Sequence, residues 1–521
     1  MKSKKKGWIF LVPIFIIGAG WMWMRNNQPQ PITVPAGAQA GDLTLQPCEY
    51  KTKTTRYRAD CGTVIVPENR NKPGSRLIAL PVKRIHTPET NPAEPIFFLT
   101  GGPGSSNMDF RPTDALLAGR DIVMVGYRGA DGSSVLQCPE MEDAILGDGQ
   151  DVTSPASLNN IAEAMRACGE RLEAEGVDLS GYTIPEVIAD MESARNALGY
   201  ERINLLSESY GTRVAQIYAY LHPQRIFRSA MIGVNPPGHF VWKAATIDSQ
   251  LEQYSQLCAK DAPCQRRTAD LAEAMHKVAH DMPRRWLFMN IDPGKVKIIS
   301  HVLLYHRNTA TMVFDAYLAA EKGDPSGLAL MSLAYDLIIP KVFIWGDLLA
   351  KGGNTDFDPA RDYNDLLAPD SILGSPMSLL IWQPASKSWP IYPVSDEFRQ
   401  VHPTDVETLL INGSVDFSTP LEFGRDELLP SLKSGKLVTL SEIGHVNDFW
   451  TANPSAADRL LTSFYATGVA DDSQFTYLPM DFMVVLGFPA LAKILLVMGL
   501  LLVAVGVFGF VRGVRQWRKA C

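Results

Sequence analysis

The chain has 521 residues, 46% of them hydrophobic, and it is therefore long enough to bury a large core. Residues 1–25 and 481–521 carry ten basic residues and one acidic residue, whereas the stretch between them carries 39 basic and 55 acidic residues. A net charge of −16 makes this central stretch unsuited to binding nucleic acid or anionic lipid. It is compatible with cationic ligands, such as free peptide N-termini.

The N-terminal residues have the pattern of a membrane segment. Four lysines among residues 2–6 precede an apolar run at 8–24. Such a run is either a retained anchor or a cleaved signal peptide, and the small residues at 36–40 that could form a cleavage site lie well beyond it. We therefore expect a membrane anchor over residues 1–25. A linker rich in Pro, Gln, Gly and Ala should follow over residues 26–45.

Short apolar runs and helical patterns alternate after this linker. We expect a helix to begin after Thr183, which can cap it together with Glu186. A strand, a helix and a further strand in succession imply a parallel sheet. The sequence therefore predicts an α/β core over residues 46–239 with a mostly parallel central sheet. Its strands are expected at residues 61–66, 76–82, 95–99, 122–125, 203–206 and 226–234.

A strand-to-helix turn at Ser209 has the features of a nucleophile elbow. An apolar strand ends before it, and a helical pattern begins after it. The turn is so tight that the residues two before and two after the nucleophile must be small. Around Ser209 these residues are Ser207 and Gly211, whereas around Ser207 one of them would be Leu205. Ser209 is therefore the candidate nucleophile.

Two backbone N–H groups are candidates for an oxyanion hole. A glycine-rich turn at residues 100–105 (TGGPGS) follows the strand at 95–99, and glycine lets the backbone approach a ligand closely. We expect Gly102 to supply one N–H group. Tyr210, which directly follows the nucleophile, should supply the other.

The candidate acid and base come later in the chain. Strands are expected at 408–411 and 437–440, and Asp416 and His445 lie just past them. The order serine, acid, histidine, each after a strand, is typical of an α/β-hydrolase. We expect His445 to accept the proton of Ser209 and Asp416 to orient the imidazole. No clustered Cys/His pattern suggests a metal site, and no cofactor is implied.

A second apolar run near the C-terminus predicts another membrane span. Residues 494–511 are uncharged, and four basic residues follow them in a tail at 512–521. We expect the transmembrane segment at 484–511. Basic flanks stay in the cytoplasm, so both termini should lie there. The middle of the chain should lie on the periplasmic side of a bacterial inner membrane, with the two transmembrane segments in the lipid bilayer.

Six of the seven cysteines fall in the part expected to be exported, where disulfides form. Six cysteines allow fifteen pairings, and sequence alone does not choose among them. Pairing of neighbours in sequence favours Cys48–Cys61, Cys138–Cys168 and Cys258–Cys264. Cys521 would lie in the cytoplasm.

Several motifs together resemble the α/β-hydrolase serine peptidases related to proline iminopeptidase and the secreted tripeptidyl aminopeptidases. The resemblance covers roughly residues 60–465. It is carried by Gly101–Gly104, Asp121–Ser134, Ser209–Ala215, His222–Arg225, Gly413–Pro420 and Gly444–His445. It implies an α/β-hydrolase core whose second part lies at 401–470. The helical region at 240–400 would then form a lid that limits substrate length, with helices expected at 251–258, 268–282, 311–321 and 328–337 and a loop at 351–358.

The resemblance implies an aminopeptidase of prolyl or tripeptidyl type that acts on peptides. An esterase or other acyl hydrolase acting on a small acyl substrate is the first alternative, because fold does not fix substrate. A catalytically idle binding domain is the second. Glu208 could recognise a substrate amine, but the sequence favours an ion pair behind the elbow, because adjacent side chains of an elbow point in different directions. We expect the amine to be bound by lid carboxylates, for which the candidates are Asp248, Glu252, Asp315, Glu321, Asp347, Asp356 and Asp358.

Overall fold

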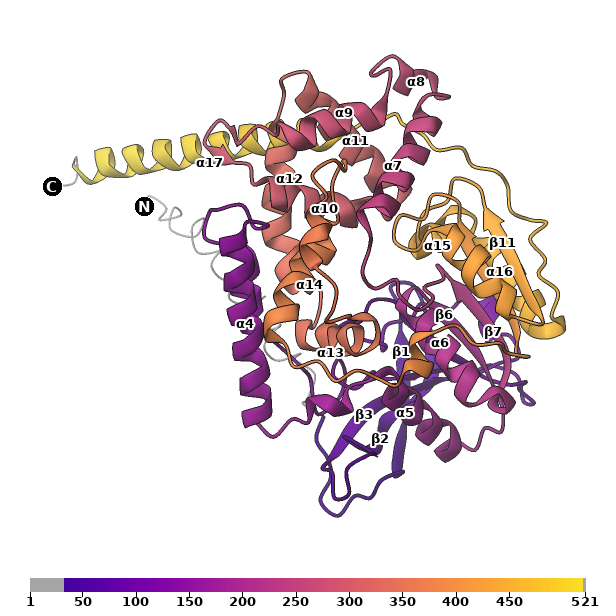
Figure 1. Ribbon diagram of the computed structural model, residues 1–521. Helices are drawn as coiled ribbons and strands as arrows, with labels where there is room; N and C mark the ends of the chain where they lie inside the picture. Colours follow the sequence, from indigo (N-terminus) through magenta and orange to yellow (C-terminus); the bar gives the residue numbers. More distant parts are fainter. Residues whose placement is uncertain (1–31, 519–521) are drawn as a thin grey trace, which may run out of the picture.

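The computed structural model describes residues 32–518, and a nine-stranded sheet forms the centre of this part of the chain (Figure 1). The strand order is β1-β2-β3-β5-β4-β6-β7-β10-β11. Pairing is antiparallel from β1 through β3 to β5 and parallel from β5 to β11. This confirms the α/β fold with a mostly parallel sheet. The strands are β1 (Leu43–Lys51), β2 (Arg56–Pro67), β3 (Leu77–Ile85), β4 (Ile96–Leu99), β5 (Ile122–Val125), β6 (Ile203–Glu208), β7 (Ile226–Ile232), β10 (Glu407–Gly413) and β11 (Gly435–Leu440).

Strand β1 lies at one edge of the sheet and has no counterpart among the expected strands. It begins inside the linker predicted for residues 26–45. Tyr50 is its only fully buried residue, so the strand lacks the apolar pattern by which buried strands are recognised. Its pairing with β2 and the Cys48–Cys61 disulfide hold it on the sheet.

Helices cover both faces of the sheet. In β6, Leu205 belongs to the apolar cluster that includes α5 and α6, whereas Leu206 belongs to the cluster that includes Phe464 of α16. Neighbouring side chains of a strand point to opposite faces, so each strand contributes to both clusters. The helices of this core are α2 (Asp114–Leu117), α3 (Pro139–Leu146), α4 (Pro155–Ala174), α5 (Ile184–Ala197), α6 (Tyr210–Leu221), α15 (Val446–Ala452) and α16 (Pro454–Thr467).

A helical insertion, residues 244–388, separates β7 from β10, and Figure 1 shows its helices gathered beyond one end of the sheet. A short hairpin, β8 (Arg285–Trp286) and β9 (Met289–Asn290), protrudes from it. Its helices are α7 (Ala244–Cys258), α8 (Ala262–Gln265), α9 (Leu271–His280), α10 (Pro293–Leu303), α11 (Arg307–Glu321), α12 (Ser326–Ile338), α13 (Trp345–Asp356) and α14 (Pro376–Ser388).

The prediction of a loop at residues 351–358 is wrong, because most of this segment belongs to α13. Its adjacent glycines are poor helix formers in isolation. In the fold, Gly352 lies against the ring of Trp382 so closely that a Cβ would be 2.8 Å from a ring carbon. Tertiary packing of this helix therefore outweighs its intrinsic propensity.

Three disulfides join cysteines that are near one another in sequence, as expected. Cys48–Cys61 links β1 to β2, Cys138–Cys168 links the start of α3 to α4, and Cys258–Cys264 closes the turn between α7 and α8. Cys521 lies outside the described residues.

Helix α17 (Phe488–Trp517) is long and apolar enough to cross a bilayer, and its apolar part is not buried by the rest of the protein. Only its beginning packs on the helical insertion. Pro489 contacts Gly327, and the Lys493 ammonium pairs with Asp324 at 2.6 Å. Residues up to Val503 line a groove with α12 and the hairpin, and the C-terminal end of the helix projects away from the body of the molecule (Figure 1). The other predicted membrane segment, residues 8–24, lies outside the described residues.

Candidate active site

Ser209 occupies the turn between β6 and α6 with a backbone φ of 49°. This left-handed conformation is unfavourable for a residue with a side chain, and it is typical of a strained nucleophile elbow. The Ser209 N–H donates to the carbonyl of Ile232 at 2.8 Å. Gly211 must lack a side chain, because a Cβ there would overlap the carbonyl oxygen of Leu99. The small-residue requirement used in the sequence argument thus has a direct steric cause.

Ser207, the other serine of the motif, faces away from solvent. Its side chain is fully buried, and its hydroxyl donates to the carbonyl of Ala230 at 3.1 Å. A serine in this position cannot meet a substrate. Of the two, only Ser209 lines a cavity.

Asp416 and His445, predicted as the acid and the base, are hydrogen-bonded to each other. The His445 Nδ1 atom lies 2.8 Å and 3.0 Å from the two carboxylate oxygens of Asp416. Asp416 also accepts N–H groups from Ser418 and Thr419 and the Thr419 hydroxyl. These donors fix the orientation of the carboxylate toward His445. Asp416 is 1% exposed, so the pair is shielded from water.

The imidazole of His445 is held from several sides. The Tyr305 ring lies edge-on to the imidazole. The backbone N–H of His445 donates to the Tyr305 carbonyl at 2.8 Å and fixes the main chain at this point. On another side, a Cβ at Gly233 would come within 2.9 Å of the ring. Gly233, with φ of 65°, therefore leaves just enough room for His445.

The glycine-rich turn lies beside the elbow. A Cβ at Gly101 would be 2.8 Å from that of Ser209, so glycine is required for this approach. Gly102 has φ of 73° and lines the same cavity as Ser209 and Tyr210. The structure thus brings both predicted oxyanion residues next to the predicted nucleophile.

Helix α13 fixes the glycine-rich turn from the helical insertion. The Gly104 N–H donates to the Asp347 carboxylate at 2.9 Å, and its carbonyl accepts the Ile344 N–H at 2.9 Å. Asp347 pairs in turn with the Lys351 ammonium at 2.7 Å, and both side chains are fully buried. Burial raises the pKa of Asp347, whereas Lys351 opposes this effect. A buried charge pair therefore couples the insertion to the predicted oxyanion hole.

Ser209, His445, Gly102 and Tyr210 line one cavity of about 400 Å³ between the sheet and the helical insertion. Most of its wall is apolar or aromatic, and it accommodates a small or extended organic substrate. The ring of Trp382 lies in this wall. The other apolar and aromatic residues include Phe240, Trp242, Val302, Tyr305, Phe343, Leu348, Met377 and Ile381.

Glu208 is the only aspartate or glutamate among the described residues that line this cavity. It is partly buried and accepts the indole N–H of Trp450 at 2.6 Å. Burial raises the pKa of the Glu208 carboxyl to about 7, and the Trp450 hydrogen bond and His445 offset only part of the rise. The alternative of an ion pair behind the elbow is wrong, because no lysine or arginine in residues 32–518 pairs with Glu208.

The seven lid carboxylates considered for amine binding do not line the cavity. Four of them form ion pairs within the protein: Asp315 with Arg267, Glu321 with Lys277, Asp347 with Lys351, and Asp356 with Arg213. Asp248 accepts hydrogen bonds from Ser371 and Ile372. Glu252 and Asp358 contact neighbours in sequence, Gln256 and Ala360. The contacts of Asp248, Asp315, Glu321 and Asp356 could not be predicted from sequence spacing, because their partners come from distant elements.

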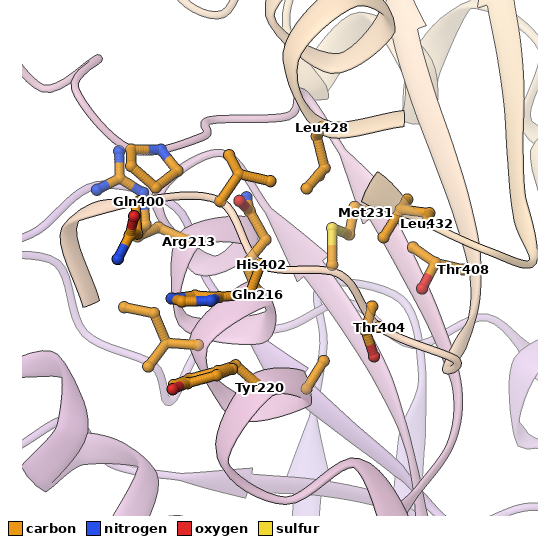
Figure 2. A pocket seen from close by; sticks show the side chains of 14 residues that line it. Arg213, Gln216, Tyr220, Met231, Gln400, His402, Thr404, Thr408, Leu428 and Leu432 are labelled. Carbon is orange, nitrogen blue, oxygen red and sulfur yellow. The ribbon is translucent and has the colours of Figure 1, made fainter. Parts of the chain in front are cut away.

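A second and much smaller pocket lies at α6, between Arg213, Gln216 and Tyr220 on the helix and His402 on the segment before β10 (Figure 2). Its volume is about 20 Å³, enough for roughly one water molecule. The His402 and Tyr220 rings stack with centroids 3.9 Å apart. None of the predicted catalytic residues lines it, so the larger cavity is the candidate active site.

Comparison with known proteins supports this location. A family model described as alpha/beta hydrolase fold matches residues 94–259, which include Ser209. A second model, described as TAP-like protein, matches residues 378–476, which include Asp416 and His445. The two matched regions lie on either side of most of the helical insertion.

Three curated relatives have moderate similarity to the chain. The tripeptidyl aminopeptidase of Streptomyces lividans is 24% identical over 509 residues, which cover 88% of this chain and 91% of that protein. Serine protease Hip1 of Mycobacterium tuberculosis is 23% identical over 505 residues, which cover 87% and 89%. The putative hydrolase YuaR of Escherichia coli is 24% identical over 244 residues, which cover 44% and 46%. The chain thus carries matches to an alpha/beta hydrolase fold model and a TAP-like model, and over most of its length it is similar to curated serine peptidases, among them a tripeptidyl aminopeptidase.

Proposed function

We propose that the protein is a membrane-anchored serine aminopeptidase that cleaves peptides near a free N-terminus. Ser209 attacks the scissile carbonyl and His445 accepts its proton. Asp416 holds the imidazole tautomer and stabilises the imidazolium. The hydrogen bonds between Asp416 and His445, and the position of Ser209 and His445 in one cavity wall, support these roles.

The N–H groups of Tyr210 and Gly102 would stabilise the tetrahedral oxyanion. Both residues line the cavity beside Ser209, and Gly101 allows the turn to lie close to the elbow. A single donor of this kind contributes about 10²–10³ in rate. His445 then donates its proton to the leaving amine. Water next attacks the acyl-enzyme; His445 accepts the proton of the water and donates it to Ser209 as the acid product leaves.

One observation carries the preference for an aminopeptidase over an esterase. Glu208 is the carboxylate in an otherwise mostly apolar cavity wall, adjacent in sequence to the nucleophile. A partly buried carboxylate without a protein cation gains most from pairing with a ligand cation. The α-ammonium group of a peptide meets this requirement, whereas a simple ester does not.

In this proposal, α17 anchors the protein by crossing the bilayer. Its length and exposed apolar surface support this role. By the positive-inside rule, Arg512, Arg515 and Arg518 place its C-terminal end in the cytoplasm. The catalytic part would then lie on the periplasmic side, where the three disulfides are stable. With a retained segment at residues 8–24, both termini would be cytoplasmic.

The test is hydrolysis of a substrate panel by the full chain in detergent or vesicles. The panel contains aminoacyl, dipeptidyl and tripeptidyl amides with free N-termini, and simple acyl esters, with Ser209→Ala as the control. We expect amides with free N-termini to be cleaved and Ser209→Ala to be inactive. Activity confined to the esters would move the protein to the acyl hydrolases, and no Ser209-dependent activity would support the idle binding domain.

A further inference from the structure

The β8–β9 hairpin presents two large apolar side chains at its tip. Leu287 and Phe288 form its two-residue turn, and they are 58% and 71% exposed. Leu287 has φ of 52°, a conformation for which such turns use glycine. A bulky apolar residue there costs conformational energy and gains nothing in water. This arrangement indicates that the tip contacts an apolar environment.

The exposed apolar surface continues onto α12. Leu333, Leu337 and Ile338 on this helix are 42%, 73% and 43% exposed. We refer to the hairpin tip and these three residues together as the hairpin surface. Contiguous apolar patches of this kind are rare on soluble proteins and mark interaction sites.

The hairpin surface lies beside the membrane helix. A groove of about 360 Å³ separates α17 from the hairpin and α12. It is lined by Trp286, Phe288 and Leu333 on one side and by Leu496, Leu500 and Val503 on the other. The apolar run of α17 begins directly after Lys493, and ten residues of helix extend about 15 Å. The hairpin therefore runs alongside the first half of that apolar run.

Basic side chains lie near both ends of the hairpin surface in sequence and at the start of the apolar run of α17. Lys493 pairs with Asp324 at the point where α17 leaves the insertion. Arg285 at the start of the hairpin and Lys341 shortly after α12 are exposed. Long basic side chains at an apolar boundary can reach lipid phosphates while their stems stay in the apolar region.

We propose that the hairpin surface inserts into the outer leaflet of the bilayer that α17 crosses, so that the helical insertion rests on the membrane. Interfacial segments of this kind enter about 5–10 Å below the headgroups. The inference depends on the proposed membrane anchoring of α17. Because α17 is fixed to the insertion at Pro489 and Lys493, a bilayer around α17 meets the hairpin without further rearrangement.

The test uses three variants of the full chain that each carry one free cysteine, with Cys521→Ser as background and the three disulfides intact. Phe288→Cys reports the hairpin, Val505→Cys in α17 reports the anchor, and Val469→Cys after α16 is the control. Their side chains are 71%, 70% and 57% exposed. Each variant is labelled with an environment-sensitive fluorophore and reconstituted in vesicles of phosphatidylethanolamine and phosphatidylglycerol. Quenching by aqueous iodide and by nitroxide-labelled lipid is measured, and fluorophosphonate labelling confirms the fold.

We expect lipid nitroxide to quench the labels at 288 and 505 and iodide to quench them roughly fivefold less than the label at 469. If the label at residue 505 lies in lipid but iodide quenches the label at 288 as strongly as that at 469, α17 crosses the bilayer and the proposed insertion of the hairpin surface is wrong. Protection of 288 from both quenchers would mean that protein covers the surface, and this also overturns docking. Exposure of 505 to iodide would overturn the anchor and with it this inference.

Discussion

At the scale of single residues, the elbow distinguishes two serines that lie two positions apart. Ser209 faces the cavity, whereas the buried Ser207 hydroxyl donates a hydrogen bond to the carbonyl of Ala230. We expect a fluorophosphonate probe to label the wild type and Ser207→Ala but not Ser209→Ala. Peptide mapping of the adduct identifies the residue. Labelling that persists in folded Ser209→Ala would contradict the assignment.

The ionisation of Glu208 should make the preference for free over acetylated peptides depend on pH. The pKa of Glu208 is about 7, so its carboxylate attracts an ammonium group only as the pH rises through about 7. A peptide α-amine loses its own proton near pH 8. The ratio of kcat/KM for free and acetylated peptides should therefore peak between about pH 7 and 8. Taking the ratio cancels the pH dependence of the catalytic steps that both substrates share.

Two variants refine this prediction. Glu208→Gln should remove the acid side of the profile, because the amide does not titrate. Trp450→Phe removes the hydrogen bond that lowers the pKa of Glu208, so the acid side should move to higher pH. An unchanged profile in both variants would show that Glu208 does not bind the amine.

At the scale of elements, α13 connects the insertion to the glycine-rich turn through the buried Asp347–Lys351 pair. We expect Lys351→Ala to lower the free energy of unfolding by about 3–5 kcal/mol, because Asp347 is left buried and unpaired. Lys277→Ala is the matched control. It breaks an exposed lysine pair with Glu321 and should cost about 1 kcal/mol or less. Denaturant unfolding measures the free energy of unfolding of both variants. Equal losses would contradict the stabilising role of the buried Asp347–Lys351 pair.

Sequence patterns were sufficient for elements with strong local signals. The parallel strands are short apolar runs, and the elbow needs small residues at fixed positions around Ser209. Strand β1 and α13 lack such signals, because β1 is mostly exposed and α13 contains adjacent glycines. The environment of Glu208 depends on Trp450, which is 242 positions away along the chain. Long-range contacts of this kind cannot be predicted from the spacing of residues along the chain. They determine which carboxylate faces the cavity.

At the scale of the whole molecule, we expect both termini in the cytoplasm and the catalytic part in the periplasm. Reporter fusions at residue 40 and at the C-terminus should show opposite sides of the membrane, periplasmic and cytoplasmic. The basic residues that flank the two apolar runs are the reason. The same side for both fusions would contradict the topology. A mature N-terminus near Ala40 would show that the first segment is a cleaved signal peptide.

We propose that the enzyme recognises a free peptide N-terminus through Glu208. The most direct measurement compares kcat/KM for one peptide amide with a free N-terminus and with an acetylated one, in the wild type and in Glu208→Gln. We predict that acetylation lowers kcat/KM about 10²-fold in the wild type, because it leaves a partly buried carboxylate unpaired. In Glu208→Gln the difference should shrink to about tenfold or less. Equal turnover of the two peptides by the wild type would contradict the account.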